Sequence, residues 1–136
     1  MKLKDEIIIQ AISALQDSGI VNDGKYDKEY KGYISSFGAS IIQSGLLPAV
    51  IFYESKPEKV KLIYAIVKVL KSKLSNYYGE IEYNNNGIKF SNFIINRKTE
   101  KKKIEKDVDE AAVALKLAIR TFKEKKSNSN NYEGTD

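Results

Sequence analysis

The sequence contains no cysteine and no histidine among its 136 residues. The lack of cysteine excludes disulfide bonds, thiolate nucleophiles and zinc–thiolate sites. The lack of histidine removes the most common general base and the most common metal-ligating side chain. These two absences exclude most catalytic constellations, so we expect that the protein is not an enzyme.

Long apolar runs are also absent. The longest runs, Ile7–Ile9 and Leu46–Tyr53, are far shorter than the roughly 20 residues that a membrane-spanning helix needs. The N-terminus has no apolar signal-peptide core, so we expect no membrane association and a cytoplasmic location. The length is that of one domain, and a domain of this size buries roughly two-thirds of its unfolded surface.

Charge is distributed unevenly along the chain, which has a net charge of +5. Residues 1–55 carry five lysines and seven acidic side chains, whereas residues 56–126 carry eighteen lysines and arginines and nine acidic side chains. A basic region favours an anionic partner, most often nucleic acid, because lysines near a phosphate chain release condensed counterions. A lysine-rich surface that contacts only solvent would have the same composition. Charge alone leaves both interpretations open.

Apolar residues recur every three or four positions over most of the chain, which predicts an all-α fold. The predicted helices cover residues 3–18, 25–44, 46–53, 56–76 and 100–126. Gly45 separates the second helix from the third, because glycine adopts the left-handed conformation at low cost. The third helix has no polar side chain, so we expect it to be buried on all sides. Ser55 and Glu58 have the spacing of a capping box for the fourth helix.

Residues 77–98 interrupt the helical pattern. Apolar and polar residues alternate there around Asn84-Asn85-Asn86-Gly87, and Asn-Gly is a strong hairpin signal. The pattern predicts a small β-hairpin near residues 80–91, or an irregular excursion between helices. Residues 127–136 are polar and asparagine-rich, which predicts a disordered tail. The expected organisation is one helical domain over residues 1–126, followed by this tail.

Close groups of carboxylates occur twice, at Asp5-Glu6 and at Asp107-x-Asp109-Glu110. Both groups lie in the first turns of predicted helices, where acidic side chains interact favourably with the helix dipole. We interpret them as helix-capping groups, not as metal ligands. The sequence also has no phosphate loop of the Gly-x-x-x-x-Gly-Lys type. We therefore predict no cofactor and no metal site.

Two segments carry a resemblance to a known family. Tyr30–Lys56 combines a tyrosine-studded amphipathic helix, the turn Ile41-Ile42-Gln43-Ser44-Gly45-Leu46 and an apolar octet that ends at Tyr53. Near the C-terminus, Asp109-Glu110-Ala111-Ala112-Val113-Ala114-Leu115 is followed by Arg120-Thr121-Phe122. The two segments resemble the small subunit of the Cmr-type (type III-B) CRISPR RNA-guided effector complex. The resemblance implies a compact bundle of about five helices.

The same resemblance implies a non-catalytic subunit of a ribonucleoprotein that acts in antiviral defence. Such a subunit is a monomer in isolation and stacks head to tail in a few copies within the complex. Its partners would be the other Cmr subunits, further copies of itself, and the backbones of guide RNA and target RNA. An alternative is the small subunit of the related Csm-type (III-A) complex.

A stand-alone helical nucleic-acid-binding protein is a further alternative from a different class. Residues 25–43 and 46–53 would then form a helix-turn-helix. This is disfavoured because residues 46–52 offer no polar side chain to a major groove.

A basic stripe supports an RNA-binding role. Lys102, Lys106, Lys116, Arg120 and Lys123 share one flank of the last predicted helix. The resemblance implies that the second helix lies alongside and adds to this stripe. The candidate nucleic-acid-binding residues are Lys28, Lys31, Gln43, Lys106, Lys116, Arg120 and Lys123. Lysines act as point charges, so we expect them to follow a phosphate backbone without reading bases.

Overall fold

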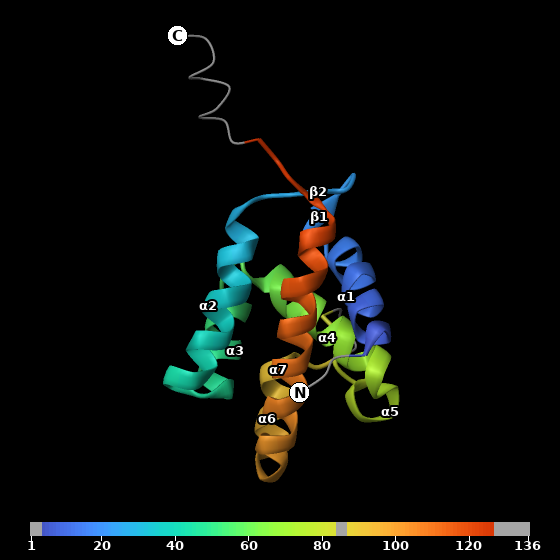
Figure 1. Cartoon of the computed structure of the whole chain (residues 1–136). Coiled ribbons are helices and arrows are strands. Elements are labelled where there is room, and N and C mark those ends of the chain that lie inside the picture. Colours follow the sequence, from blue (N-terminus) through green and yellow to red (C-terminus); the bar gives the residue numbers. More distant parts are fainter. Residues whose placement is uncertain (1–3, 84–86, 127–136) are drawn as a thin grey trace.

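The computed structural model describes residues 4–83 and 87–126, which are mostly helical (Figure 1). The helices are α1 (Asp5–Asp17), α2 (Glu29–Ser44), α3 (Leu46–Glu54), α4 (Val60–Lys73), α5 (Ser75–Tyr78), α6 (Phe90–Asn96) and α7 (Lys101–Ala118), with 3-10 turns η1 (Lys98–Glu100) and η2 (Ile119–Thr121). The strands are β1 (Val21–Asn22), β2 (Lys25–Tyr26) and β3 (Lys123–Glu124). The predicted helical fold class is confirmed, with a small sheet in addition. The predicted tail, residues 127–136, lies outside the described residues.

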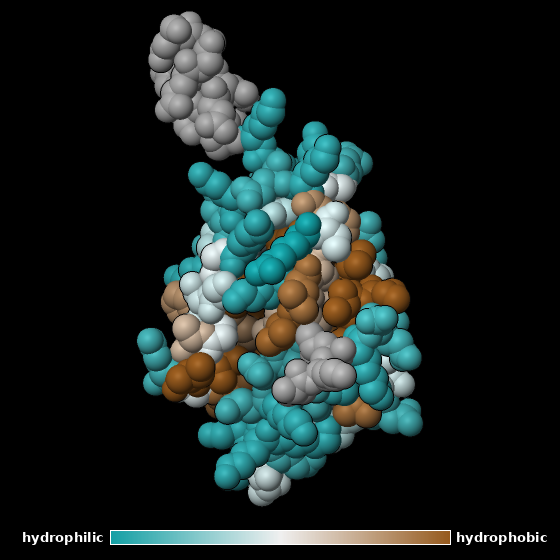
Figure 2. Space-filling view, viewed as in Figure 1, coloured by the Kyte–Doolittle hydropathy of each residue, from teal (hydrophilic) through white to brown (hydrophobic). Residues whose placement is uncertain are grey.

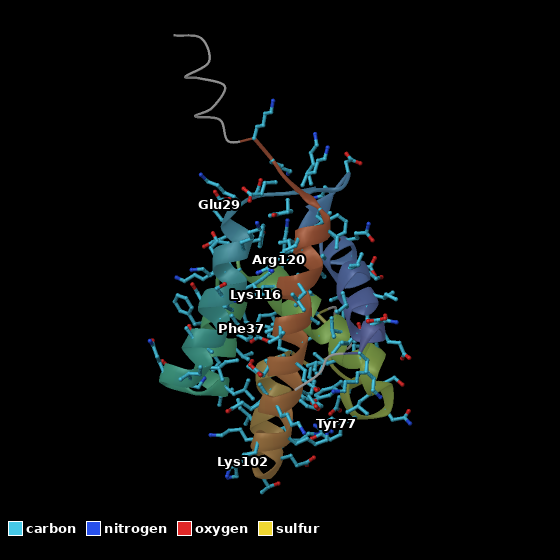
Figure 3. All side chains as sticks on the ribbon, in the orientation of Figure 1. Glu29, Phe37, Tyr77, Lys102, Lys116 and Arg120 are labelled. Atoms are coloured by element: carbon cyan, nitrogen blue, oxygen red, sulfur yellow. The ribbon has the colours of Figure 1, made fainter. Side chains whose placement is uncertain are left out.

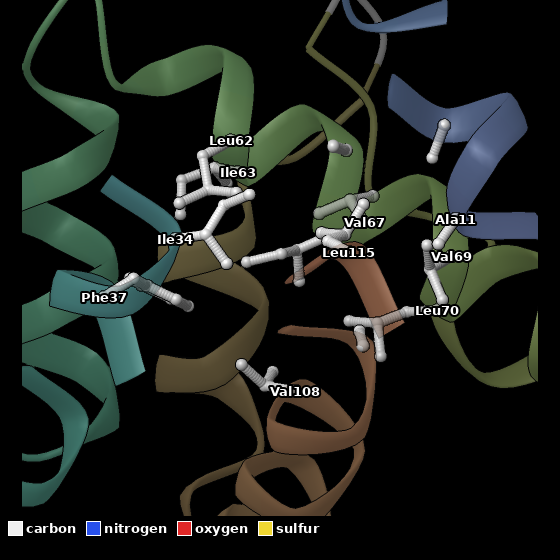
Figure 4. Close-up of a cluster of buried hydrophobic side chains, with 14 of the residues drawn as sticks. Ala11, Ile34, Phe37, Leu62, Ile63, Val67, Val69, Leu70, Val108 and Leu115 are labelled. Carbon is white, nitrogen blue, oxygen red and sulfur yellow. The ribbon is translucent and has the colours of Figure 1, made fainter. Parts of the chain in front are cut away.

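The hydrophobic core forms where α1, α2 and α7 pack around α4. Half of the side chains of α4 are buried, because this helix has neighbours on several sides. Figure 4 shows Ile34 and Phe37 of α2 beside Leu115 of α7 in this cluster. The apolar stripes predicted for these helices therefore face one another, and the packing of α2 against α7 creates the groove described below.

Three short strands join the two ends of the helical region. β1 pairs antiparallel with β2, and β2 pairs in parallel with β3. The Lys123 and Lys125 N–H groups donate to the carbonyl oxygens of Gly24 (3.0 Å) and Tyr26 (2.8 Å). The predicted helices were too long at these points: α2 begins at Glu29, and the last helix gives way to η2 after Ala118. Two-residue strands have too few residues to show an alternating pattern, so the sequence did not reveal them.

Gly45 forms a sharp turn between α2 and α3. Its φ of 96° confirms the predicted positive φ, but its ψ of 164° is extended and not left-handed helical. This region of φ and ψ is accessible essentially only to glycine. The expected burial of α3 on all sides was wrong. Leu46, Ala49, Val50 and Tyr53 are buried, whereas the outer side of the helix is exposed, because α2, α4 and α6 pack against its inner side.

The substitution Gly45→Val is expected to lower the free energy of unfolding by about 1–3 kcal/mol, since valine is strained at this φ and ψ. An added Cβ would find ordinary space, with Pro48 Cδ at 3.7 Å, so the cost is conformational. Gly32→Val is the matched control, because Gly32 is helical, exposed and open to solvent. Urea denaturation measures both variants. Equal losses at the two positions would contradict the backbone explanation.

In the described parts of the predicted hairpin, residues 80–83 and 87–91, the chain forms an irregular excursion and not a two-stranded ribbon. Ile81 and Ile88 make an isolated parallel bridge, and the Glu82 N–H donates to the Ile88 carbonyl oxygen at 3.0 Å. The Asn84–Asn86 part of the predicted turn lies outside the described residues. Only glycine fits at position 87, where the backbone runs close to Glu82, because a Cβ there would lie only 1.9 Å from Glu82 Cβ. The next residues form the helix α6, which the sequence pattern did not predict.

The carboxylate of Glu54 explains why α6 begins where it does. Its Oε2 accepts hydrogen bonds from the Ser91 N–H (3.2 Å) and from the Tyr83 hydroxyl (2.6 Å), and its Oε1 accepts from Ser91 Oγ (2.6 Å). A carboxylate at a helix N-terminus satisfies a free N–H group and opposes the helix dipole. This cap comes from the end of α3, so it is a tertiary and not a local signal.

The predicted capping box at Ser55 and Glu58 was wrong. Ser55 Oγ donates to the Phe52 carbonyl oxygen at 2.7 Å and so helps to end α3. The next helix starts only at Val60 and has no side-chain cap. The acidic pair Asp5 and Glu6, in contrast, lies in the first turn of α1 as expected.

Within residues 4–83 and 87–126, none of the helices combines the length and apolarity needed to cross a membrane.

Candidate nucleic-acid interface

A groove of about 220 Å³ lies between α2 and the C-terminal end of α7. The residues that line it are Lys31, Ile34 and Ser35 on one side and Lys116, Ile119 and Arg120 on the other. In Figure 3, Lys116 lies in the upper half of α7 and Arg120 lies just beyond it in η2, whereas Lys102 lies at the opposite end of α7. The structure thus brings together three of the seven residues that the sequence indicated as candidates.

Local sequence explains the form of the groove. Lys116 in α7 and Arg120 in η2 are four residues apart, and because η2 continues directly from α7 they lie on the same side, about one turn from each other. Ile34 and Ile119 are buried and form the floor between the two walls. Ser35 is small and exposed, so it leaves the groove open.

Lys31 already has partners within the chain. Its Nζ lies 3.2 Å from Oε2 of Glu124 and 5.9 Å from the centroid of the Tyr26 ring. Hydrogen bonds with Tyr26 and Glu124 raise the pKa of Lys31, so its ammonium stays charged. Within the described part of the chain, no ion pair within 4.0 Å joins Lys116 or Arg120 to an acidic side chain. These two cations are therefore the more available for an external anion.

The other four candidates do not line the groove. Lys28 precedes the first turn of α2, and Lys123 lies in β3 instead of continuing the last helix. Gln43 is twelve residues from Lys31 on α2, which corresponds to about 18 Å along the helix. Lys106 is ten residues before Lys116, or about 15 Å. The stripe predicted on one flank is therefore divided, because Lys106 lies too far along α7 and Lys123 lies in β3.

The family model described as CRISPR-associated protein (Cas_Cmr5) matches residues 5–120. The chain belongs to this family. The match extends from α1 through Arg120, so it includes both walls of the groove. The resemblance seen in the sequence is confirmed at this level. No curated protein and no solved structure matches the chain.

In this Cas_Cmr5 family member, Asp107 is not the helix cap that the sequence suggested. It lies in the second turn of α7, whose first turn contains no acidic residue. Its buried Oδ2 accepts hydrogen bonds from the Tyr78 hydroxyl (2.6 Å) and from Lys103 Nζ (2.9 Å). Lys73 Nζ lies 3.7 Å from its Oδ1. Asp107 therefore joins α4, α5 and α7.

The environment of this carboxylate decides its charge. Burial raises the pKa of Asp107, but hydrogen bonds from Tyr78 and Lys103 and the positive charges of Lys103 and Lys73 outweigh it and lower the pKa below its usual value. Burial, with the hydrogen bond to Asp107, raises the pKa of Tyr78. The carboxylate is thus ionised and the phenol neutral near pH 7, which is the arrangement that their hydrogen bond requires.

A cluster of aromatic rings and one ammonium group was not visible in the sequence. Lys59 Nζ lies 5.3 Å, 5.0 Å and 5.7 Å from the ring centroids of Tyr33, Phe52 and Tyr53. The Tyr53 hydroxyl donates to the Tyr33 carbonyl oxygen at 3.0 Å, which holds α3 against α2. Cation–π contacts of this kind stabilise the position of the lysine. They depend on the packing of α2 against α3, which no local pattern specifies.

Proposed function

We propose that this protein is a non-catalytic small subunit of a Cmr-type (type III-B) RNA-targeting ribonucleoprotein, in which several copies form a row that lines the path of guide RNA and target RNA. Membership of the Cas_Cmr5 family supports assignment to such a complex. The observation that supports RNA binding is the groove between α2 and the C-terminal end of α7, which is lined by Lys31, Lys116 and Arg120.

The chemistry of the groove suits a phosphate backbone. Arg120 offers a planar fork of donors that can bind one phosphate through two hydrogen bonds, and the lysines act as point charges. These groups carry little information about base sequence. The proposal that the subunit contributes no catalytic group rests on the sequence, which has no histidine and no cysteine.

Reversal of the three groove charges, Lys31→Glu, Lys116→Glu and Arg120→Glu together, is expected to weaken the binding of target RNA by the assembled complex. The decrease in affinity should be similar for unrelated target sequences, because the groove binds only phosphates. The slope of log K against log salt concentration changes by about 0.7 for each single-strand phosphate that the protein neutralises, so removal of three cations should flatten it by about two. Filter binding over a salt series measures both quantities.

The matched control reverses three lysines that do not line the groove, Lys61, Lys89 and Lys98. It has the same change in net charge and should leave the salt slope nearly unchanged. Equal decreases in affinity in the two triple variants would show that net charge and not the groove matters. Unaltered affinity and slope in a groove variant that assembles normally would show that its cations face only solvent.

A further inference from the structure

The C-terminal strand β3 places a carboxylate at one end of the groove. Glu124 Oε2 accepts a hydrogen bond from Lys31 Nζ at 3.2 Å, and Lys31 is one of the three cations that line the groove. Lys116 and Arg120, the other two, have no acidic partner within 4.0 Å in the part of the chain that the structure describes. An anion of the chain itself therefore occupies one of the three cationic positions of the groove.

The small sheet holds Glu124 in this position. β3 pairs in parallel with β2, and Glu124 is the register partner of Tyr26. Register partners project to the same face of a sheet, and Lys31 Nζ lies 5.9 Å from the centroid of the Tyr26 ring. The N–H groups on either side of Glu124, those of Lys123 and Lys125, both donate to carbonyl oxygens at or beside β2. Backbone pairing thus positions the carboxylate, and the ion pair with Lys31 is not its only support.

Other acidic side chains near this end of α2 do not contact the cations of the groove. Asp27 Oδ1 lies 3.7 Å from Lys125 Nζ, and Glu29 forms no ion pair within 4.0 Å among the described residues. In Figure 2, hydrophilic surface extends from the small sheet onto the neighbouring ends of α2 and α7. Among the described acids of this surface, Glu124 is the one that pairs with a groove cation.

We infer that Glu124 is an internal competitor of RNA phosphate: it neutralises Lys31 in the free groove, and a strand must displace it to bind all three cations. This rests on the proposed function, and it adds a residue that sets the affinity of the same site. A carboxylate and a phosphate diester both accept hydrogen bonds from an ammonium group, and their like charges repel each other at one cation. Glu124 lies beyond residues 5–120, so the family match does not include it.

The ion pair is weak enough for a bound strand to displace it. The side chains of Lys31 and Glu124 are 47% and 45% exposed, and exposed pairs change an equilibrium by a factor of about five or less. Because Glu124 belongs to the same chain, its effective concentration at Lys31 is on the order of millimolar, so a dilute free anion competes poorly. A strand already held at Lys116 and Arg120 keeps its next phosphate equally near. Glu124 therefore favours strands that occupy the whole groove over isolated phosphates.

A double-mutant cycle in the assembled complex tests this competition. Glu124→Gln keeps the size of the side chain and removes its charge, so we expect target RNA to bind at least twofold more tightly. The slope of log K against log salt concentration should steepen by up to about 0.7 for each copy that contacts the strand, because no displaced carboxylate takes up a cation. In a Lys31→Met background the same substitution should have no effect, since its partner is absent. Filter binding over a salt series measures all four proteins.

The matched control is Asp17→Asn. It breaks an exposed ion pair between Asp17 Oδ2 and Lys68 Nζ (3.5 Å), and it makes the same change in net charge. Neither residue lines the groove, so the affinity for RNA should stay nearly unchanged. A gain from Glu124→Gln that Asp17→Asn equals, or that persists in the Lys31→Met background, would show an effect of net charge and would overturn the inference.

The remaining outcomes separate this inference from the proposed function. Weaker binding by Glu124→Gln would show that Glu124 holds Lys31 in place for RNA, and it would overturn the competition. Unchanged binding by Glu124→Gln, together with a loss of affinity in the triple variant of Lys31, Lys116 and Arg120, would overturn the competition and leave the proposed function intact. Unchanged binding by both variants would overturn both.

Discussion

Replacement of Glu54 by alanine is expected to lower the free energy of unfolding by about 3 kcal/mol. The change removes a carboxylate that accepts hydrogen bonds from the Tyr83 hydroxyl, the Ser91 N–H and Ser91 Oγ. Hydrogen bonds to a charged group stabilise by about 1.5–3 kcal/mol each, and partly buried donors left without an acceptor add a desolvation cost. The net cost is smaller than the sum of these contributions, because Glu54 is only partly buried and water can reach part of the site.

The effect of Glu54→Ala should be concentrated at α6. Hydrogen exchange of the amides of residues 90–96 should become much faster, since the helix loses the cap at its start. Glu58→Ala is the control, because Glu58 is exposed, and surface substitutions of this kind usually change stability by less than about 0.5 kcal/mol. If urea denaturation gave the same midpoint for both variants, the hydrogen bonds of Glu54 would not stabilise the fold.

Replacement of Asp107 by alanine is expected to cost about 3 kcal/mol near pH 7. It leaves the buried Tyr78 hydroxyl without an acceptor and removes the anion between Lys103 and Lys73. Breaking a buried, hydrogen-bonded charge pair typically costs about 3–5 kcal/mol, and we expect the lower end because the lysines are half exposed. Asp109→Ala, on the exposed side of the same helix, is the matched control and should have little effect.

The same site predicts how stability depends on pH. The pKa of Asp107 is lower in the folded chain than its usual value, which is about 4 in an unfolded chain. The folded state therefore binds this proton less readily than the unfolded state. Its contribution is complete above about pH 5 and decreases as the pH falls through about 4 and below. Unfolding free energies of wild type and Asp107→Asn should converge over that range, and a difference that stays constant to about pH 3 would contradict this assignment.

The amino-acid sequence determined the main helices of this protein. The apolar periodicity placed Ile34 and Phe37 on the inner face of α2 and Leu115 on the inner face of α7, and all three are buried. Gly45 marked the turn between α2 and α3, because only glycine readily adopts a positive φ there. These predictions succeeded since each depends on residues within one or two helical turns.

The candidate interface was predicted only in part. Lys116 and Arg120 share a helix face by their spacing, which the sequence shows directly. That Lys31 faces them across a groove depends on the packing of α2 against α7, and its pairing with Glu124 depends on β3. Lys106 does not line the groove, because it lies ten residues before Lys116, about 15 Å along the helix. Its contact with RNA stays a prediction.

Only the tertiary structure decided the remaining features. The start of α6 is set by Glu54, 37 residues before Ser91, and the role of Asp107 is set by Tyr78, 29 residues before it. The open outer side of α3 followed from the number of helices that pack against it, which its uniformly apolar sequence could not indicate. In each case the deciding group is distant along the chain but close in space, so no local pattern of spacing or composition contains it.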